Sequence, residues 1–85
     1  VRRMTCYAGT PNPALPRWHA AANVLLIGCT QRYPGRDPRA GWALARRLGD
    51  MWQLLADDGD PGATYDGLRD AMLAEYERLP VREAA

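Results

Sequence analysis

The residues of this chain with the richest chemistry are two cysteines and one histidine, Cys6, Cys29 and His19. Thiolate and imidazole groups bind zinc, and together they can form a redox or metal site. Structural zinc sites take four ligands and contain close pairs such as Cys-x-x-Cys, whereas these residues lie 13 and 10 positions apart. We therefore expect two free thiols, no metal and no cofactor. A metal or redox protein that uses these three residues is our third hypothesis.

A nucleophile and base pair could be built only from the same three side chains. If one helix contains both His19 and Cys29, they lie about 15 Å apart along its axis and cannot touch. Cys6 could reach His19 through the segment between them, but no third residue that would orient the imidazole is evident. The sequence contains no glycine-rich phosphate loop and no serine hydrolase motif. We therefore expect the chain not to be an enzyme.

An acidic stretch at 57–60 invites comparison with calcium-binding loops. The EF-hand pattern needs glycine at its sixth position and a glutamate at its twelfth. Counted from Asp57, the sixth position holds the required glycine, Gly62, but the twelfth holds Leu68 in place of a glutamate. The stretch is therefore predicted to be a turn and a helix cap.

All 11 basic residues are arginines, and they are unevenly distributed. Residues 1–39 carry six arginines against one acid, and residues 40–85 carry five arginines against nine acids. Because arginine binds phosphates well, nucleic-acid regulation through the basic half is the alternative hypothesis. The candidate contacts are Arg2, Arg3, Arg32, Arg36 and Arg39. The acidic C-terminal helix would be repelled by phosphates, so we consider nucleic acid an unlikely partner.

The elements that position these residues are predicted to be helices. Asp37 followed by Pro38 is a helix start, after a turn at 33–36, and a four-three-four spacing of apolar residues extends the helix over 38–56. A second helix is predicted over 62–79, again after an Asp-Pro pair and before Pro80. Short loops make such helices antiparallel neighbours. The apolar stripes are Leu44, Leu48, Met51 and Leu55 in the first helix, and Tyr65, Leu68, Met72, Tyr76 and Leu79 in the second.

The segment 17–31 is ambiguous. Trp18, Ala22, Leu25 and Cys29 recur at helical spacing, whereas the apolar run 24–27 closed by Gly28 also fits a short buried strand. We favour a helix because the neighbouring alanines suit a helix better than a strand.

The predicted fold is one small, mostly all-α domain over residues 1–85. It comprises an extended proline-rich arm at 1–16, the helical part at 17–79 with the antiparallel hairpin, and a frayed tail at 80–85. The apolar run is far shorter than the ~20 residues of a membrane span, and no leader-like segment is recognised. We therefore expect a cytoplasmic location and no membrane contact.

Small and aromatic residues suggest where this thin core makes contacts. Gly41, Ala45 and Gly49 form one edge of the helix at 38–56, and two glycines within a helix suggest close packing against another backbone. Tryptophan is enriched at interfaces. Our leading hypothesis is a non-enzymatic protein–protein interaction module, a small accessory or regulatory protein that forms a homodimer or docks on a larger protein. The candidate interface residues are Trp18, Gly41, Trp42, Ala45, Gly49 and Trp52.

Overall fold

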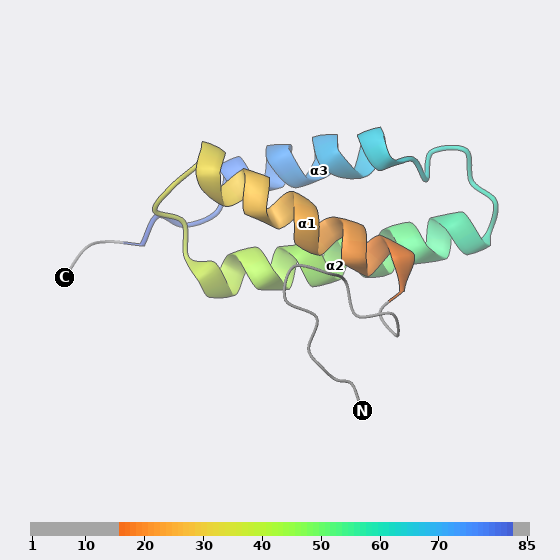
Figure 1. The fold of residues 1–85 in the computed structure, drawn as a ribbon, viewed down its shortest axis with the longest axis horizontal. Helices are drawn as coiled ribbons and strands as arrows, with labels where there is room; N and C mark the ends of the chain where they lie inside the picture. Colours follow the sequence, from red (N-terminus) through yellow and green to blue (C-terminus); the bar gives the residue numbers. More distant parts are fainter. Residues whose placement is uncertain (1–15, 83–85) are drawn as a thin grey trace, which may run out of the picture.

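The computed structural model describes residues 16–82, and these residues fold into three helices (Figure 1). Helix α1 spans Arg17–Arg32, α2 spans Pro38–Asp57 and α3 spans Tyr65–Glu77. The prediction of a mostly all-α fold is confirmed. Residues 24–29 lie within α1, so the helical interpretation of the ambiguous segment is correct and the strand alternative is wrong. The predicted arm at 1–16 lies, except for Pro16, outside the described residues.

The three helices form a bundle in which each packs against both others. Helix α2 runs opposite to α1 and α3 (Figure 1). The contact between α1 and α2 is the most extensive of the three. The N-terminal helix is therefore a full member of the bundle, where the sequence suggested an addition to a hairpin of the other two helices.

The helix starts follow local capping chemistry. Asp37 Oδ1 accepts a hydrogen bond of 3.0 Å from the Arg39 amide, and Pro38 begins α2 as predicted. Helix α3 begins at Tyr65 and not at 62, because Thr64 Oγ1 is the cap and accepts from the Gly67 amide at 3.0 Å. The second Asp-Pro pair instead makes a turn, in which Asp60 Oδ1 accepts from the Gly62 amide at 2.7 Å.

One apolar core lies among the helices, with 11 buried hydrophobic residues in the described part of the chain. The predicted apolar stripes differ from this core at several positions. In α1 the third buried position is Leu26, and Leu25 is only partly buried, as are Leu55 and Leu79. Met51 in α2 and Tyr65 in α3 are 43% and 47% exposed. The buried residues are Trp18, Ala22, Leu26, Cys29, Leu44, Ala45, Leu48, Trp52, Leu68, Met72 and Tyr76.

The small-residue edge of α2 explains why Met51 is displaced from the core. A Cβ atom on Gly49 would lie 3.1 Å from the Cα of His19, so the backbones of α1 and α2 approach closely there. A Cβ atom on Gly41 would lie 3.3 Å from Leu26 Cδ1 and 3.2 Å from Tyr76 Cε2. Helix α1 thus covers the glycine edge, and the buried face of α2 turns toward that edge and away from Met51.

Residues 80–82 are held in place and do not begin a frayed tail. The Asp37 amide donates to the Pro80 carbonyl at 3.1 Å, and the Arg82 amide donates to the Gly35 carbonyl at 2.6 Å. Arg36 and Val81 form an antiparallel bridge. Gly35 has a φ of 86°, which makes the predicted turn at 33–36 possible at low cost. The segment after α3 is therefore tied to the α1–α2 loop.

We predict that Gly49→Ala destabilises the bundle. The new Cβ would lie 2.9 Å from His19 Cδ2 and 3.1 Å from His19 Cα, and such overpacking typically costs about 1–3 kcal/mol, more than the nearly 1 kcal/mol gained in helix propensity. A net loss of about 1 kcal/mol lowers the Tm of a domain of this size by roughly 4–8 °C. Thermal unfolding followed by circular dichroism measures the change.

The matched control is Gly28→Ala in the middle of α1. No atom lies within 4 Å of the Cβ that this substitution adds, so only the propensity gain remains and the Tm should rise. Equal and positive shifts for the two variants would show that α1 does not pack closely on Gly49.

Candidate interaction surfaces

Five of the six predicted interface residues lie inside the bundle. Gly41 and Gly49 are buried against Tyr76, Leu26 and His19, and the other three are buried core side chains: Trp18, Ala45 and Trp52. The Trp52 indole also donates to the Thr64 carbonyl at 3.1 Å and so holds the start of α3 against α2. These five residues make contacts between helices of one chain and present no surface to a second molecule.

Trp42 is the exception, because 58% of its surface is exposed. The contacts of Gly49 with His19 and of Gly41 with Leu26 fix the register of the two antiparallel helices. This register places Trp42 at the level of α1 between Val24 and Ile27. Those two side chains are 55% and 60% exposed. We call Val24, Ile27 and Trp42 the α1–α2 apolar patch.

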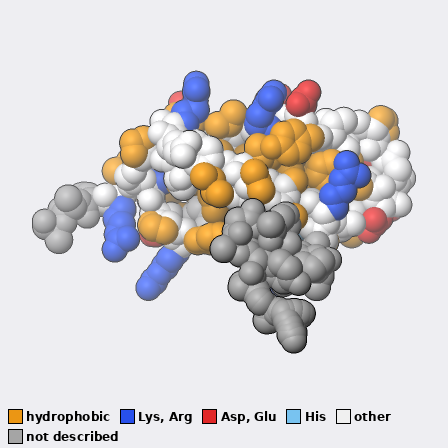
Figure 2. All heavy atoms as spheres, in the orientation of Figure 1, with side chains coloured by type: hydrophobic (Ala, Val, Ile, Leu, Met, Phe, Trp, Pro, Cys, Tyr) orange, Lys and Arg blue, Asp and Glu red, His pale blue; other side chains and the backbone are white. Residues whose placement is uncertain are grey.

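Two of these residues, Val24 and Ile27, belong to the apolar run 24–27, which by its sequence also fits a short buried strand. In a helix, the run places Leu26 in the core and turns Val24 and Ile27 outward, because successive residues are about 100° apart. Figure 2 shows hydrophobic side chains along the middle of this face, where α1 runs.

The three described arginines proposed for nucleic-acid contact lie at one end of the bundle, but their surroundings differ. Arg32 and Arg39 are exposed. Arg36 instead donates to the Glu77 carbonyl at 3.0 Å, and its guanidinium lies 5.4 Å from the centre of the Tyr33 ring. Arg36 therefore caps the end of α3. Arg2 and Arg3 lie outside the described residues.

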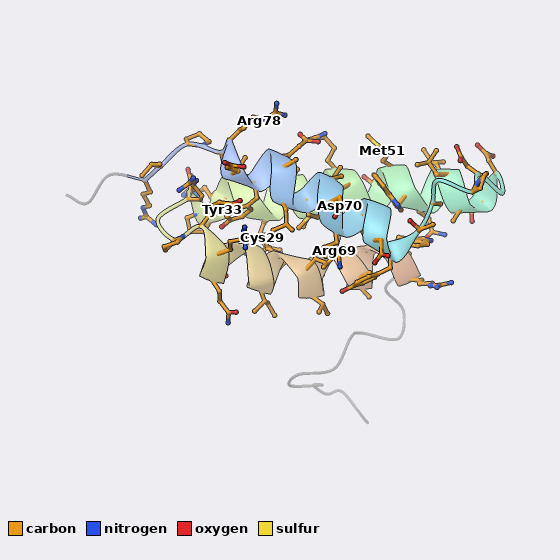
Figure 3. All side chains as sticks on the ribbon, turned by 90° about the horizontal axis from the view of Figure 1, so that it is seen from above. Cys29, Tyr33, Met51, Arg69, Asp70 and Arg78 are labelled. Carbon is orange, nitrogen blue, oxygen red and sulfur yellow. The ribbon has the colours of Figure 1, made fainter. Side chains whose placement is uncertain are left out.

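Tyr33 is the centre of an aromatic and cationic cluster at this end. Its ring stacks on Tyr76 with 6.4 Å between centroids, and Arg32 lies over it at 5.6 Å. Cys29 in the last turn of α1 and Tyr33, the C-cap of this helix, lie at the same end of the bundle as Arg78 (Figure 3). The cluster connects the end of α1 to the end of α3 and holds the guanidinium groups of Arg32 and Arg36 against one ring.

The two described residues with possible metal or nucleophile chemistry, His19 and Cys29, lie at opposite ends of α1. Cys29 is buried in the core. His19 lies at the other end of α1, where its Nε2 is 2.5 Å from Asp50 Oδ1 on α2. Cys6 lies outside the described residues. Within residues 16–82, no group of three or more His, Cys, Asp or Glu side chains is arranged to hold a metal ion.

Burial changes the acidity of two core groups. Loss of solvation raises the pKa of the Cys29 thiol above its usual 9.0. Loss of solvation also raises the pKa of the Tyr76 phenol above its usual 10.0, and the nearby Cys29 raises it further, while Arg36 acts in the opposite direction. Both groups are therefore protonated at neutral pH, and Cys29 is a poor nucleophile.

We predict that these two groups make the protein less stable in alkali. Because their pKa values are higher in the folded chain, the unfolded chain releases the protons first, and the free energy of unfolding falls as the pH rises through 9 and 10. Below pH 9 this contribution is constant. Urea unfolding at a series of pH values measures the slope, and Tyr76→Phe should reduce the decline above pH 10. An unchanged slope in Tyr76→Phe would show that the phenol ionises as easily in the fold as in the unfolded chain.

Comparisons with known proteins add no likeness: no family model, no curated protein and no solved structure matches this chain. In the described residues, no helix is both long enough and apolar enough to cross a membrane. The candidate functional surfaces are therefore those that the geometry itself defines, the α1–α2 apolar patch and the arginine-rich end.

Proposed function

We propose that this chain is a non-enzymatic interaction module that binds another protein molecule through the α1–α2 apolar patch. The observation that carries the proposal is the exposure of Trp42 at the same level of the bundle as the exposed Val24 and Ile27. Single exposed apolar residues are common on protein surfaces, but several large ones on one face mark an interaction site. A tryptophan that becomes buried at the centre of a protein–protein interface contributes strongly to the binding free energy.

The helices that carry the patch suit this role because they are rigid. Helix α1 lies against α2 with backbone contact at Gly49, and the His19–Asp50 bond joins the same pair. A surface on two fixed helices loses little conformational entropy when it binds. The module can therefore present the patch without rearrangement.

A second copy of the chain is the simplest partner. A two-fold axis near Trp42 would place the patch of one molecule on the same patch of the other, which is the commonest arrangement of soluble homo-oligomers. The same surface would also serve to dock the module on a larger protein as an accessory or regulatory subunit.

The groups that suggested other functions have structural roles that support this proposal. His19 bonds to Asp50 across two helices, Cys29 fills the core, and Arg36 caps α3. Nucleic-acid binding has weaker support than it had from the sequence, because the described residues contain nine arginines and nine acids and Arg36 is engaged within the fold.

We predict that Trp42→Ser abolishes self-association through the patch. The indole is mostly exposed in the monomer, so its loss should change the Tm little while removing the largest apolar group of the interface. Sedimentation velocity at high micromolar concentration measures the association state. It should be done in about 0.5 M salt, where charge effects are screened and apolar contacts persist.

Met51→Ser is the matched control, because Met51 is also an exposed apolar residue of α2 but does not lie on the glycine edge that faces α1. In Figure 3 its side chain points away from the bundle. The control should associate like the unmodified chain. A protein that is monomeric at high micromolar concentration would contradict self-association, and equal association of Trp42→Ser and the unmodified chain would contradict the patch.

A further inference from the structure

The two ends of the bundle carry opposite charge. We propose that copies of this chain bind end to end, with the basic end of one molecule on the acidic end of the next. This inference deepens the self-association of the proposed function, but it uses different residues. It follows from where the bundle brings charged side chains together, because the arginines of the basic end come from segments far apart in the sequence and the acidic stretch 57–60 lies at the opposite end.

The basic end forms where α1 ends, α2 begins and the segment after α3 returns. The hydrogen bonds from Asp37 to Pro80 and from Arg82 to Gly35 bring the C-terminal segment to the α1–α2 loop. The described acids at this end are Asp37, which caps α2, and Glu77. Among the described residues, five arginines against these two acids give a net charge of +3, and Figure 2 shows basic side chains projecting at this end of the bundle. The arginines are Arg32, Arg36, Arg39, Arg78 and Arg82.

The acidic end lies at the opposite side of the bundle, where α2 ends, α3 begins and α1 starts (Figure 1). Among the described residues, this end carries two arginines. Arg17 lies over the Trp18 ring at 5.1 Å, and Arg69, one turn into α3, pairs with Asp70 at 3.4 Å and with Asp66 at 3.7 Å. Five described acids against these two arginines give a net charge of −3, equal and opposite to that of the described residues at the basic end. The acids are Asp57, Asp58, Asp60, Asp66 and Asp70.

Exposed apolar side chains accompany the charges at both ends. Val81, beside Arg82 at the basic end, is 61% exposed. At the acidic end, Leu54 in the last turn of α2 and Tyr65 at the start of α3 are 67% and 47% exposed. Apolar contacts surrounded by charged groups are the usual composition of a protein–protein interface. The apolar groups can therefore add to the attraction that the charges provide.

The geometry of such a contact fixes how it behaves. An end-to-end contact joins two different surfaces, so each added molecule leaves both a basic and an acidic end free, and the assembly grows as an open chain. Exposed charges attract over about 10 Å at 0.1 M salt and over only about 3 Å at 1 M. The association should therefore be present in dilute salt and disappear in concentrated salt. Association through the α1–α2 apolar patch should instead persist in concentrated salt, because salt does not screen apolar contacts.

The test uses two full-length variants that each have ends of like charge. Arg39→Glu with Arg82→Glu makes the basic end acidic, and the side chains of these residues make no hydrogen bond to another residue of the described part of the chain. Asp57→Arg with Asp58→Arg makes the acidic end basic. Both variants also carry Trp42→Ser, which removes the patch as a second source of association. Sedimentation velocity at about 20 mM salt is run on each variant alone and on their equal mixture.

We expect each variant alone to be monomeric and the equal mixture to associate, because one variant has two acidic ends and the other has two basic ends. At about 0.5 M salt these complexes should dissociate, with affinity lowered at least about tenfold. A mixture that stays monomeric at 20 mM salt would overturn the end-to-end contact and leave the patch hypothesis intact. The proposal would also be overturned if the chain with only Trp42→Ser stayed monomeric in dilute salt but bound a short DNA duplex through the basic end.

Discussion

The contact between the backbones of α1 and α2 at Gly49 is the constraint on which the rest of the structure depends. A side chain at this position would occupy the space of the His19 backbone. The contact fixes how far the two helices are offset along their axes, and two turns away Gly41 leaves room for the side chains of Leu26 and Tyr76. Once the offset is set, Leu26 enters the core and Trp42 lies at the same level along the bundle as Val24 and Ile27. Both the core and the candidate patch follow from this one register.

The parts of the fold that depend on local chemistry could be predicted from the sequence. Asp37 and Pro38 fix the start of α2, the turn at 33–36 needs Gly35, and the glycine edge of α2 indicates close packing. The second Asp-Pro pair was misleading, because Thr64 competes with it as a cap and lies closer to the apolar positions of α3. Local signals of this kind are reliable when no alternative cap is available within a few residues.

The candidate surfaces could not be predicted because they depend on which helix covers which face. The glycine edge indicated a close neighbour, but only the bundle shows that the neighbour is α1 of the same chain. The charged ends could not be predicted either, because they also depend on how the helices pack. Tyr33, Tyr76 and Arg36 connect the α1–α2 loop to the end of α3, and this connection gathers arginines that are almost 50 residues apart in sequence. Charge patterns along the chain gave only the coarse division into a basic and an acidic half.

The stability of the three-helix bundle alone does not explain why α1 has Val24 and Ile27 on its exposed face. β-Branched residues at exposed positions of a helix cost a few tenths of a kcal/mol each relative to alanine, because their side chains lose rotamers there. A core position would repay this cost by burial, but both side chains are mostly exposed, and the buried positions of α1 are filled by Trp18, Ala22, Leu26 and Cys29. Their presence beside Trp42 is thus unfavourable for the isolated bundle, and it becomes favourable once a contact outside these three helices removes the patch from water.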